Sequence, residues 1–193
     1  MAESGVTSGE VSTITNGTSS DSLAKITIEI PPTSVADDET FVTTIVGTVN
    51  AAYAQDEAGI FKPGYLRTKT TPQSPSGRTP LGCISIRKLS DTRGELGLFA
   101  VSLDQRGRGF GRDLLVFAEN WCRDNLGGPG VAISQVDLLV PTHFEHPFKV
   151  RLNAWYSKLG YQLVGRQDFA VEYPSLAPQL AGPTEYRLYE KKL

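Results

Sequence analysis

One short stretch, Arg106–Arg112 with the sequence RGRGFGR, constrains the fold more than any other part of the chain. It follows a run typical of a strand, Glu95–Val101, and leads into Asp113–Leu126, whose apolar residues recur at helical spacing. A glycine-rich turn between a strand and a helix directs several backbone N–H groups to one spot, where the helix N-terminus adds partial positive charge. With its arginines, this turn is predicted to bind a diphosphate.

The spacing of the glycines indicates which diphosphate is bound. A dinucleotide-binding turn needs G-x-G-x-x-G, but Arg112 occupies the position of the third glycine. The ATPase pattern G-x-x-x-x-G-K-[ST] occurs nowhere in the chain. The turn instead carries R-x-x-G-x-G, on Arg106, Gly109 and Gly111. Such a turn alone is also compatible with a solvated basic loop.

A second motif lies downstream, on a predicted helix. Its sequence is NAWYSKLGY, over Asn153–Tyr161. Together the two motifs resemble the coenzyme A pyrophosphate loop and the second signature of the GNAT acetyltransferase superfamily. The resemblance covers roughly Leu81 to Leu193 and implies acetyl-CoA as cosubstrate.

The apolar pattern and the resemblance together predict an α/β (α+β) fold, a mixed and mostly antiparallel, splayed sheet of six to seven strands with helices on both faces. We expect residues 1–22 to form a flexible tail and 23–193 to form one N-acetyltransferase domain. The expected strands are 25–30, 81–89, 95–101, 135–140, 161–173 and 185–193, and the expected helices are 34–54, 109–126 and 147–159. Two proline-rich segments, 59–80 and 174–184, are predicted to be loops over the active site.

The resemblance implies a set of cofactor-binding residues. The backbone of Phe99, Ala100 and Val101 pairs with the pantetheine arm, and the Val101 N–H faces the thioester carbonyl. Asn153 bonds the same arm, and Tyr156 lies near the coenzyme sulfur. The diphosphate is bound by the turn, formed by Arg106, Gly107, Arg108, Gly109, Phe110, Gly111 and Arg112. Gly109 and Gly111 permit a close backbone approach that a Cβ would block.

The resemblance also implies two catalytic residues. Glu95 lies six residues before Val101, an even offset that predicts the same face of the strand, and it matches the general base of the histone-modifying branch. Tyr156 matches the acid that reprotonates the leaving thiolate. The alternatives are an exposed hairpin carboxylate for Glu95 and a packing tyrosine for Tyr156. Candidates for attracting a cationic amine are Glu145, Glu172 and Glu185, each equally typical of a surface residue.

Composition limits the class of protein. With 193 residues and a formal net charge of −2, the chain suits one domain and predicts no affinity for nucleic acid. It has no apolar run of membrane-spanning length, and its Ser/Thr-rich start is no signal peptide, so we expect no membrane partner and a cytoplasmic location. His143 and His146 lack a third distant ligand, so no metal site is expected.

The predicted function is an acetyl-CoA-dependent N-acetyltransferase that acts by direct attack in a ternary complex. The acceptor expected is a primary amine of a small molecule or an amino-acid-like compound. Two alternatives stay open, a peptide or protein N-acetyltransferase and a non-catalytic coenzyme A-binding protein. The sequence leaves a homodimer open as well.

Overall fold

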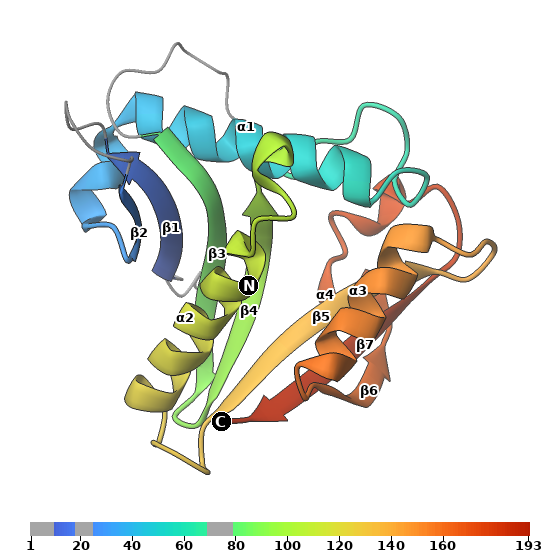
Figure 1. The fold of residues 1–193 in the computed structure, drawn as a ribbon. Coiled ribbons are helices and arrows are strands. Elements are labelled where there is room, and N and C mark those ends of the chain that lie inside the picture. The colour runs from blue at the N-terminus through green and yellow to red at the C-terminus, as the bar shows by residue number, and fades with distance from the viewer. Residues whose placement is uncertain (1–9, 18–24, 69–78) are drawn as a thin grey trace, which may run out of the picture.

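A computed structural model describes residues 10–17, 25–68 and 79–193. Their strands form a seven-stranded sheet in the order β2-β1-β3-β4-β5-β7-β6 (Figure 1). The strands are β1 Glu10–Gly17, β2 Lys25–Glu29, β3 Thr79–Ser90, β4 Arg93–Val101, β5 Ile133–Pro141, β6 Gln162–Gln167 and β7 Thr184–Lys192. The α-helices are α1 Glu39–Asp56, α2 Phe110–Asn125, α3 Pro147–Lys158 and the single turn α4 Phe169–Glu172. Short 3-10 turns span Thr33–Asp37, Leu103–Gln105 and Ala177–Gln179.

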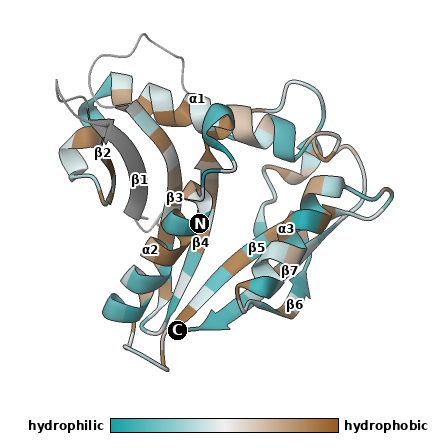
Figure 2. Cartoon of the chain, viewed as in Figure 1, coloured by the Kyte–Doolittle hydropathy of each residue, from teal (hydrophilic) through white to brown (hydrophobic). Residues whose placement is uncertain are grey.

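Helices cover both faces of the sheet. Hydrophobic and hydrophilic residues alternate in bands along α2 (Figure 2), and its apolar residues pack with α3 against one face. That cluster includes Ile84, Ile86, Leu96, Leu114, Leu115, Val136, Leu138 and Tyr156. On the other face, Val49 and Ala52 of α1 pack on β3 and β4, and Phe169 of α4 packs on Leu139 and Tyr186. The predicted fold class is therefore confirmed.

The parallel neighbours β4 and β5 separate along their length. Their pairing joins Arg93–Leu96 to Ile133–Val136 and ends there, whereas the five other neighbouring pairs in the sheet are antiparallel. Beyond this point the two strands diverge toward α1 (Figure 1). The edge of β4 from Gly97 to Val101 consequently has no strand partner on the β5 side among the described residues.

A β-bulge in β4 reverses which residues face which helix. Cys83 of β3 pairs with Ala100 and Ser85 pairs with Gly97, so two residues of β4 lie opposite one of β3. Within the bulge Leu98 has φ 41°, a left-handed conformation that is uncommon for leucine. Before the bulge Leu96 packs with α2, and after it Phe99 and Val101 do.

The bulge overturns one sequence-based expectation. Glu95 and Val101 were predicted to share a face because their offset is even. Glu95 instead lies on the face opposite Leu96, since a Cβ built on Gly97 would contact the Glu95 carboxylate. Val101 lies on the α2 face, near Gly111. An extra residue between them changes the parity of the alternation.

Two predicted boundaries were also wrong. The strand expected over 161–173 ends at Gln167, because Asp168 accepts a hydrogen bond from the Ala170 N–H at 2.8 Å and so caps α4. Residues 10–17, expected within a flexible tail, form β1 between β2 and β3. Its stretch VSTIT is rich in β-branched residues, which favour strands. Part of the loop predicted over 59–80, residues 69–78, lies outside the described residues.

Among the helices described, none combines the length and the apolar character needed to cross a bilayer.

Candidate active site

A cavity of about 280 Å³ occupies the gap between β4 and β5. Phe99 and Tyr156, which pack on the α2 and α3 face of the sheet, line it. So do Phe169 and Tyr186, which pack together on the opposite face. The cavity therefore passes through the sheet, and the glycine turn before α2 opens onto it as well.

The glycine turn leaves open space at the start of α2. Gly109 caps the helix with φ 93°, and Gly107 has φ 79°, both in the region that favours glycine. A Cβ built on either residue would contact no atom within 4 Å. The first N–H groups of a helix have no partner within the helix, so this turn suits an anion such as a diphosphate.

Eight of the twelve predicted cofactor-binding residues line the cavity. They are Phe99, Val101, Arg106, Gly107, Gly109, Phe110, Gly111 and Tyr156. The other four do not line it. Ala100 is buried against α1, and Arg108 and Arg112 are exposed. The Asn153 side chain accepts a hydrogen bond from the Tyr189 hydroxyl on β7.

Arg106 has a different partner from the one expected. Its guanidinium forms two hydrogen bonds of 2.8 Å with the carboxylate of Asp56, the last residue of α1. Such a bidentate pair fixes both side chains. Arg106 thus attaches the glycine turn to α1, and of the three arginines of the turn Arg108 and Arg112 stay exposed. The partner lies 50 residues earlier, so no local pattern indicates it.

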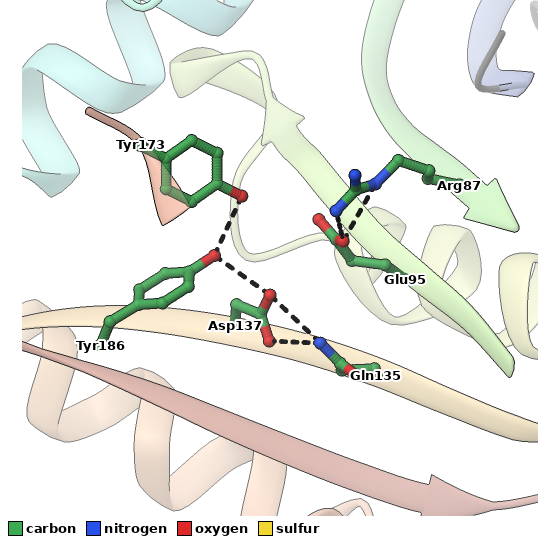
Figure 3. A network of polar contacts seen from close by, with 6 residues as sticks. All are labelled: Arg87, Glu95, Gln135, Asp137, Tyr173 and Tyr186. Atoms are coloured by element: carbon green, nitrogen blue, oxygen red, sulfur yellow. Dashed lines mark hydrogen bonds and ion pairs between the residues drawn. The ribbon is translucent and has the colours of Figure 1, made fainter. Parts of the chain in front are cut away.

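Glu95, the predicted base, lines the cavity and is paired with a cation. Its carboxylate accepts hydrogen bonds from the Arg87 guanidinium, the cross-strand neighbour on β3 (Figure 3). The Glu95 side chain is 14% exposed and that of Arg87 is 50% exposed. The pair therefore reaches from the cavity wall to solvent, and the negative charge of Glu95 is largely offset.

Asp137, on β5, is a cavity residue that the sequence analysis missed. Its carboxylate accepts hydrogen bonds from the Gln135 amide (3.0 Å) and the Tyr186 hydroxyl (3.0 Å), and the Tyr173 hydroxyl lies 3.1 Å from that of Tyr186 (Figure 3). Burial, and next the negative charge of Glu95, raise the pKa of Asp137 to about 6. In the sequence, Asp137 was visible only as a polar residue two positions after Gln135 in an otherwise apolar strand.

A buried ion pair forms another part of the cavity wall. The Lys149 Nζ on α3 lies 2.9 Å from the Glu57 Oε1, on the residue just after α1. The side chains of Lys149 and Glu57 are only 6% and 8% exposed. The second carboxylate oxygen of Glu57 has no hydrogen-bond partner in the part of the chain that the structure describes. The sequence analysis missed both residues, which are 92 positions apart.

Tyr156, the predicted acid, is buried and lines the cavity. Its ring contacts those of Trp155, Tyr161 and Tyr189. Burial raises the pKa of its hydroxyl above the usual value of tyrosine.

The predicted amine-attracting glutamates do not line the cavity. Glu145 and Glu172 are exposed. Glu185 is paired with Arg166 and Arg187.

Residues 76–163 match the family model described as an acetyltransferase (GNAT) domain. The chain carries a GNAT acetyltransferase domain. The predicted family and the predicted enzyme class, an acyltransferase, are thereby confirmed. No curated protein matches the sequence significantly.

Three solved structures resemble the chain at low sequence identity. An IAA acetyltransferase from Bacillus cereus ATCC 14579 has 15% identity over 65% of this chain and 74% of its own, with a TM-score of 0.44. A GNAT family acetyltransferase from Elizabethkingia anophelis with acetyl-CoA bound has 14% identity, over 65% and 72%, with a TM-score of 0.46. An aminoglycoside 6'-N-acetyltransferase complexed with coenzyme A has 18% identity, over 63% and 69%, with a TM-score of 0.44. Likenesses of this size identify no acceptor.

The raised pKa of Asp137 in this acetyltransferase predicts a pH-dependent effect on stability. A carboxyl with a pKa of about 6 in the folded protein and 3.8 ordinarily stabilises the fold when protonated, below about pH 4. That contribution is lost as the pH rises through 6. We expect Asp137→Asn, which stays neutral, to raise the free energy of unfolding at pH 8 by about 1–2 kcal/mol, after discounting for partial exposure.

Urea denaturation at pH 4 and pH 8 measures this gain, which should vanish at pH 4. Asp124→Asn is the matched control, because Asp124 is exposed and paired only with its neighbour Arg123. An Asp137→Asn protein that is less stable than the parent at pH 8 would show that the carboxylate is not strained by burial.

Proposed function

We propose that this acetyltransferase transfers acetyl from acetyl-CoA to a primary amine of a small molecule, by direct attack in a ternary complex. The observation that carries the proposal is the cavity through the gap between β4 and β5. It joins the glycine turn to two carboxylates, Glu95 and Asp137, on the other face of the sheet. A thioester and an amine that enter from opposite faces meet in this gap, so no acyl-enzyme is required.

The free edge of β4 suits the pantetheine arm and the thioester carbonyl. The Ser102 N–H donates to the Leu81 carbonyl on β3 at 2.8 Å. Because successive residues of a strand direct their N–H groups to opposite sides, the Val101 N–H is directed toward the gap. We assign it the hydrogen bond to the thioester oxygen, where negative charge develops during attack.

We assign the proton transfers to two side chains. Asp137 accepts the proton of the attacking amine, because a carboxylate with a pKa of about 6 suits a general base near neutral pH, whereas Glu95 is paired with Arg87. As the tetrahedral adduct collapses, the C–S bond breaks and Tyr156 gives its proton to the thiolate. Glu95, the base expected from the sequence, stays as the alternative, and in our assignment it acts by raising the proton affinity of Asp137.

Residues 60–62 and 179–181 are hydrogen-bonded to each other near the cavity. We take this as a reason to favour a small acceptor over a peptide. The Lys62 N–H donates to the Gln179 carbonyl at 2.8 Å, and the Ala181 N–H donates to the Ile60 carbonyl at 2.9 Å. Phe61 and Leu180 form a β-bridge between them. This bridged lid, residues 60–62 and 179–181, packs in the same cluster as Phe169 and Tyr186 of the cavity wall, and in our proposal it leaves less room for an extended peptide than for a small amine. A panel of small amines and peptides, with release of the coenzyme thiol as readout, tests the assignment.

The first prediction concerns the glycine turn. Gly109→Trp should abolish binding of acetyl-CoA, because the indole fills the open space before α2. Calorimetric titration measures the affinity. Gly128→Trp is the matched control: its φ is also positive, 84°, and its Cβ position is also open, but it does not line the cavity. Equal affinities in the two folded variants would exclude the turn as the diphosphate site.

The second prediction concerns the base. Asp137→Asn should lower kcat by about 10²–10⁴-fold at neutral pH, the usual share of general-base catalysis. Glu95→Gln should lower kcat far less. It should also move the acidic limb of the kcat profile from about pH 6 to lower pH, because removing a like charge lowers the pKa of Asp137.

The reverse pattern, in which Glu95→Gln is inactive and Asp137→Asn is active, would return the role of base to Glu95. Affinity for acetyl-CoA serves as the control and should be unchanged in both variants.

The third prediction concerns the acid. Tyr156→Phe should lower kcat by about tenfold or more, with little loss of acetyl-CoA affinity. Tyr161→Phe is the control, since Tyr161 shares the ring cluster but its hydroxyl is bonded to Ser134 outside the cavity. If both variants lose the same activity, Tyr156 is a packing residue.

A further inference from the structure

Arg67 lines the same cavity and differs from the other cations in its wall. Arg106 is paired with Asp56, and Lys149 is paired with Glu57. Arg67 forms no ion pair with any carboxylate of the described residues; its guanidinium carbon lies 4.9 Å from the centre of the Tyr53 ring. Glu57 acts on Arg67 electrostatically, but its charge is already balanced by Lys149. This part of the wall thus has one positive charge in excess.

A second unpaired group lies beside Arg67. The Tyr65 hydroxyl interacts electrostatically with Arg67, and it is buried without a hydrogen-bond partner of proper geometry among the described residues. The Tyr65 ring is fixed by stacking on Phe61 of the bridged lid, with ring centres 4.0 Å apart. A buried donor without an acceptor costs about 1–3 kcal/mol. A guanidinium and a hydroxyl in this state match the acceptor oxygens of a carboxylate.

The part of the cavity between β4 and β5 has the opposite charge, an excess of negative charge. Glu95 is paired with Arg87, whereas Asp137 forms no ion pair among the described residues and feels Arg87 only at longer range. The cavity therefore presents an acidic group on β5 and a basic group on the segment after α1. A molecule that carries both an ammonium and a carboxylate satisfies both groups, whereas a purely cationic amine leaves Arg67 unpaired and adds a like charge near it.

We propose that the acceptor is an amino acid or a close analogue, whose carboxylate binds Arg67 while its amine faces Asp137. This inference rests on the proposed function, because it assigns a ligand class to the acceptor half of the same cavity. Arg67 is thus a specificity residue and takes no part in the proton transfers.

The experiment compares amino acids with the amines formed by their decarboxylation, so that each pair differs only in the carboxylate. The parent enzyme should show a kcat/KM at least about tenfold higher for the amino acid of the preferred pair. Arg67→Ala should lower that kcat/KM by about 10–100-fold, mainly by raising KM. A loss of this size is expected when charge-assisted hydrogen bonds to the substrate are removed. For the matched amine it should change the value less than about threefold. Arg67→Lys, which keeps the charge, should recover part of the loss, and Arg123→Ala on the exposed side of α2 should change neither value.

Binding separates this inference from the proposed function. Calorimetric titration of the same pairs into the coenzyme A complex needs no turnover. Selective binding of the amino acid that Arg67→Ala removes supports the inference, even if no acetyl transfer is detected and the proposed function fails. Equal binding within every pair, or equal losses for both members in folded Arg67→Ala, would overturn the inference while leaving amine acetylation intact.

Discussion

The separation of β4 from β5 after Leu96 and Val136 is the constraint on which the site depends. A closed sheet would satisfy the backbone of Gly97–Val101 with a neighbouring strand and would leave no passage between its two faces. Because the strands part, the cavity runs through the sheet, and a backbone edge without a strand partner lines it, where a ligand could pair as a strand would. The bulge at Leu98 contributes to the same opening. It turns Phe99 and Val101 toward α2, while Glu95 stays on the opposite face of the sheet.

Such an opening has costs that the rest of the fold must offset. Leu98 is held in a left-handed conformation, and Asp137 is kept in surroundings that disfavour its charged form. One carboxylate oxygen of the buried Glu57 lacks a hydrogen-bond partner among the described residues. All three lie around the cavity. Away from it, the cluster between α2 and the sheet is apolar and closely buried, with Leu114, Ala118 and Cys122 completely inaccessible. Strain is thus concentrated around the cavity, where our proposal uses a raised pKa and an open backbone.

The sequence predicted the features that depend on neighbouring residues. The glycine turn and the helix after it follow from residue spacing, and the resemblance of this turn and of Asn153–Tyr161 to two family motifs carried the fold class and the family. What it did not predict depends on contacts between distant residues. Arg106 was assigned to the diphosphate because its partner, Asp56, lies 50 positions away. Glu95 was placed on the face of Val101 because an alternating pattern does not reveal a bulge. Asp137 had a visible signal, a polar residue recurring in an apolar strand, but its meaning required the neighbouring Tyr186.

The last turn of α1 brings the separate walls of the cavity together. Tyr53, Asp56 and Glu57 are spaced i, i+3 and i+4, so they project from one side of the helix. Each contacts a different part of the site: Tyr53 lies under Arg67, Asp56 holds Arg106 of the glycine turn, and Glu57 holds Lys149 of α3. A shift of this one turn would move the diphosphate end and the acceptor end of the cavity together. The end of α1 therefore links Arg67, the glycine turn and α3 through one element and not through independent loops.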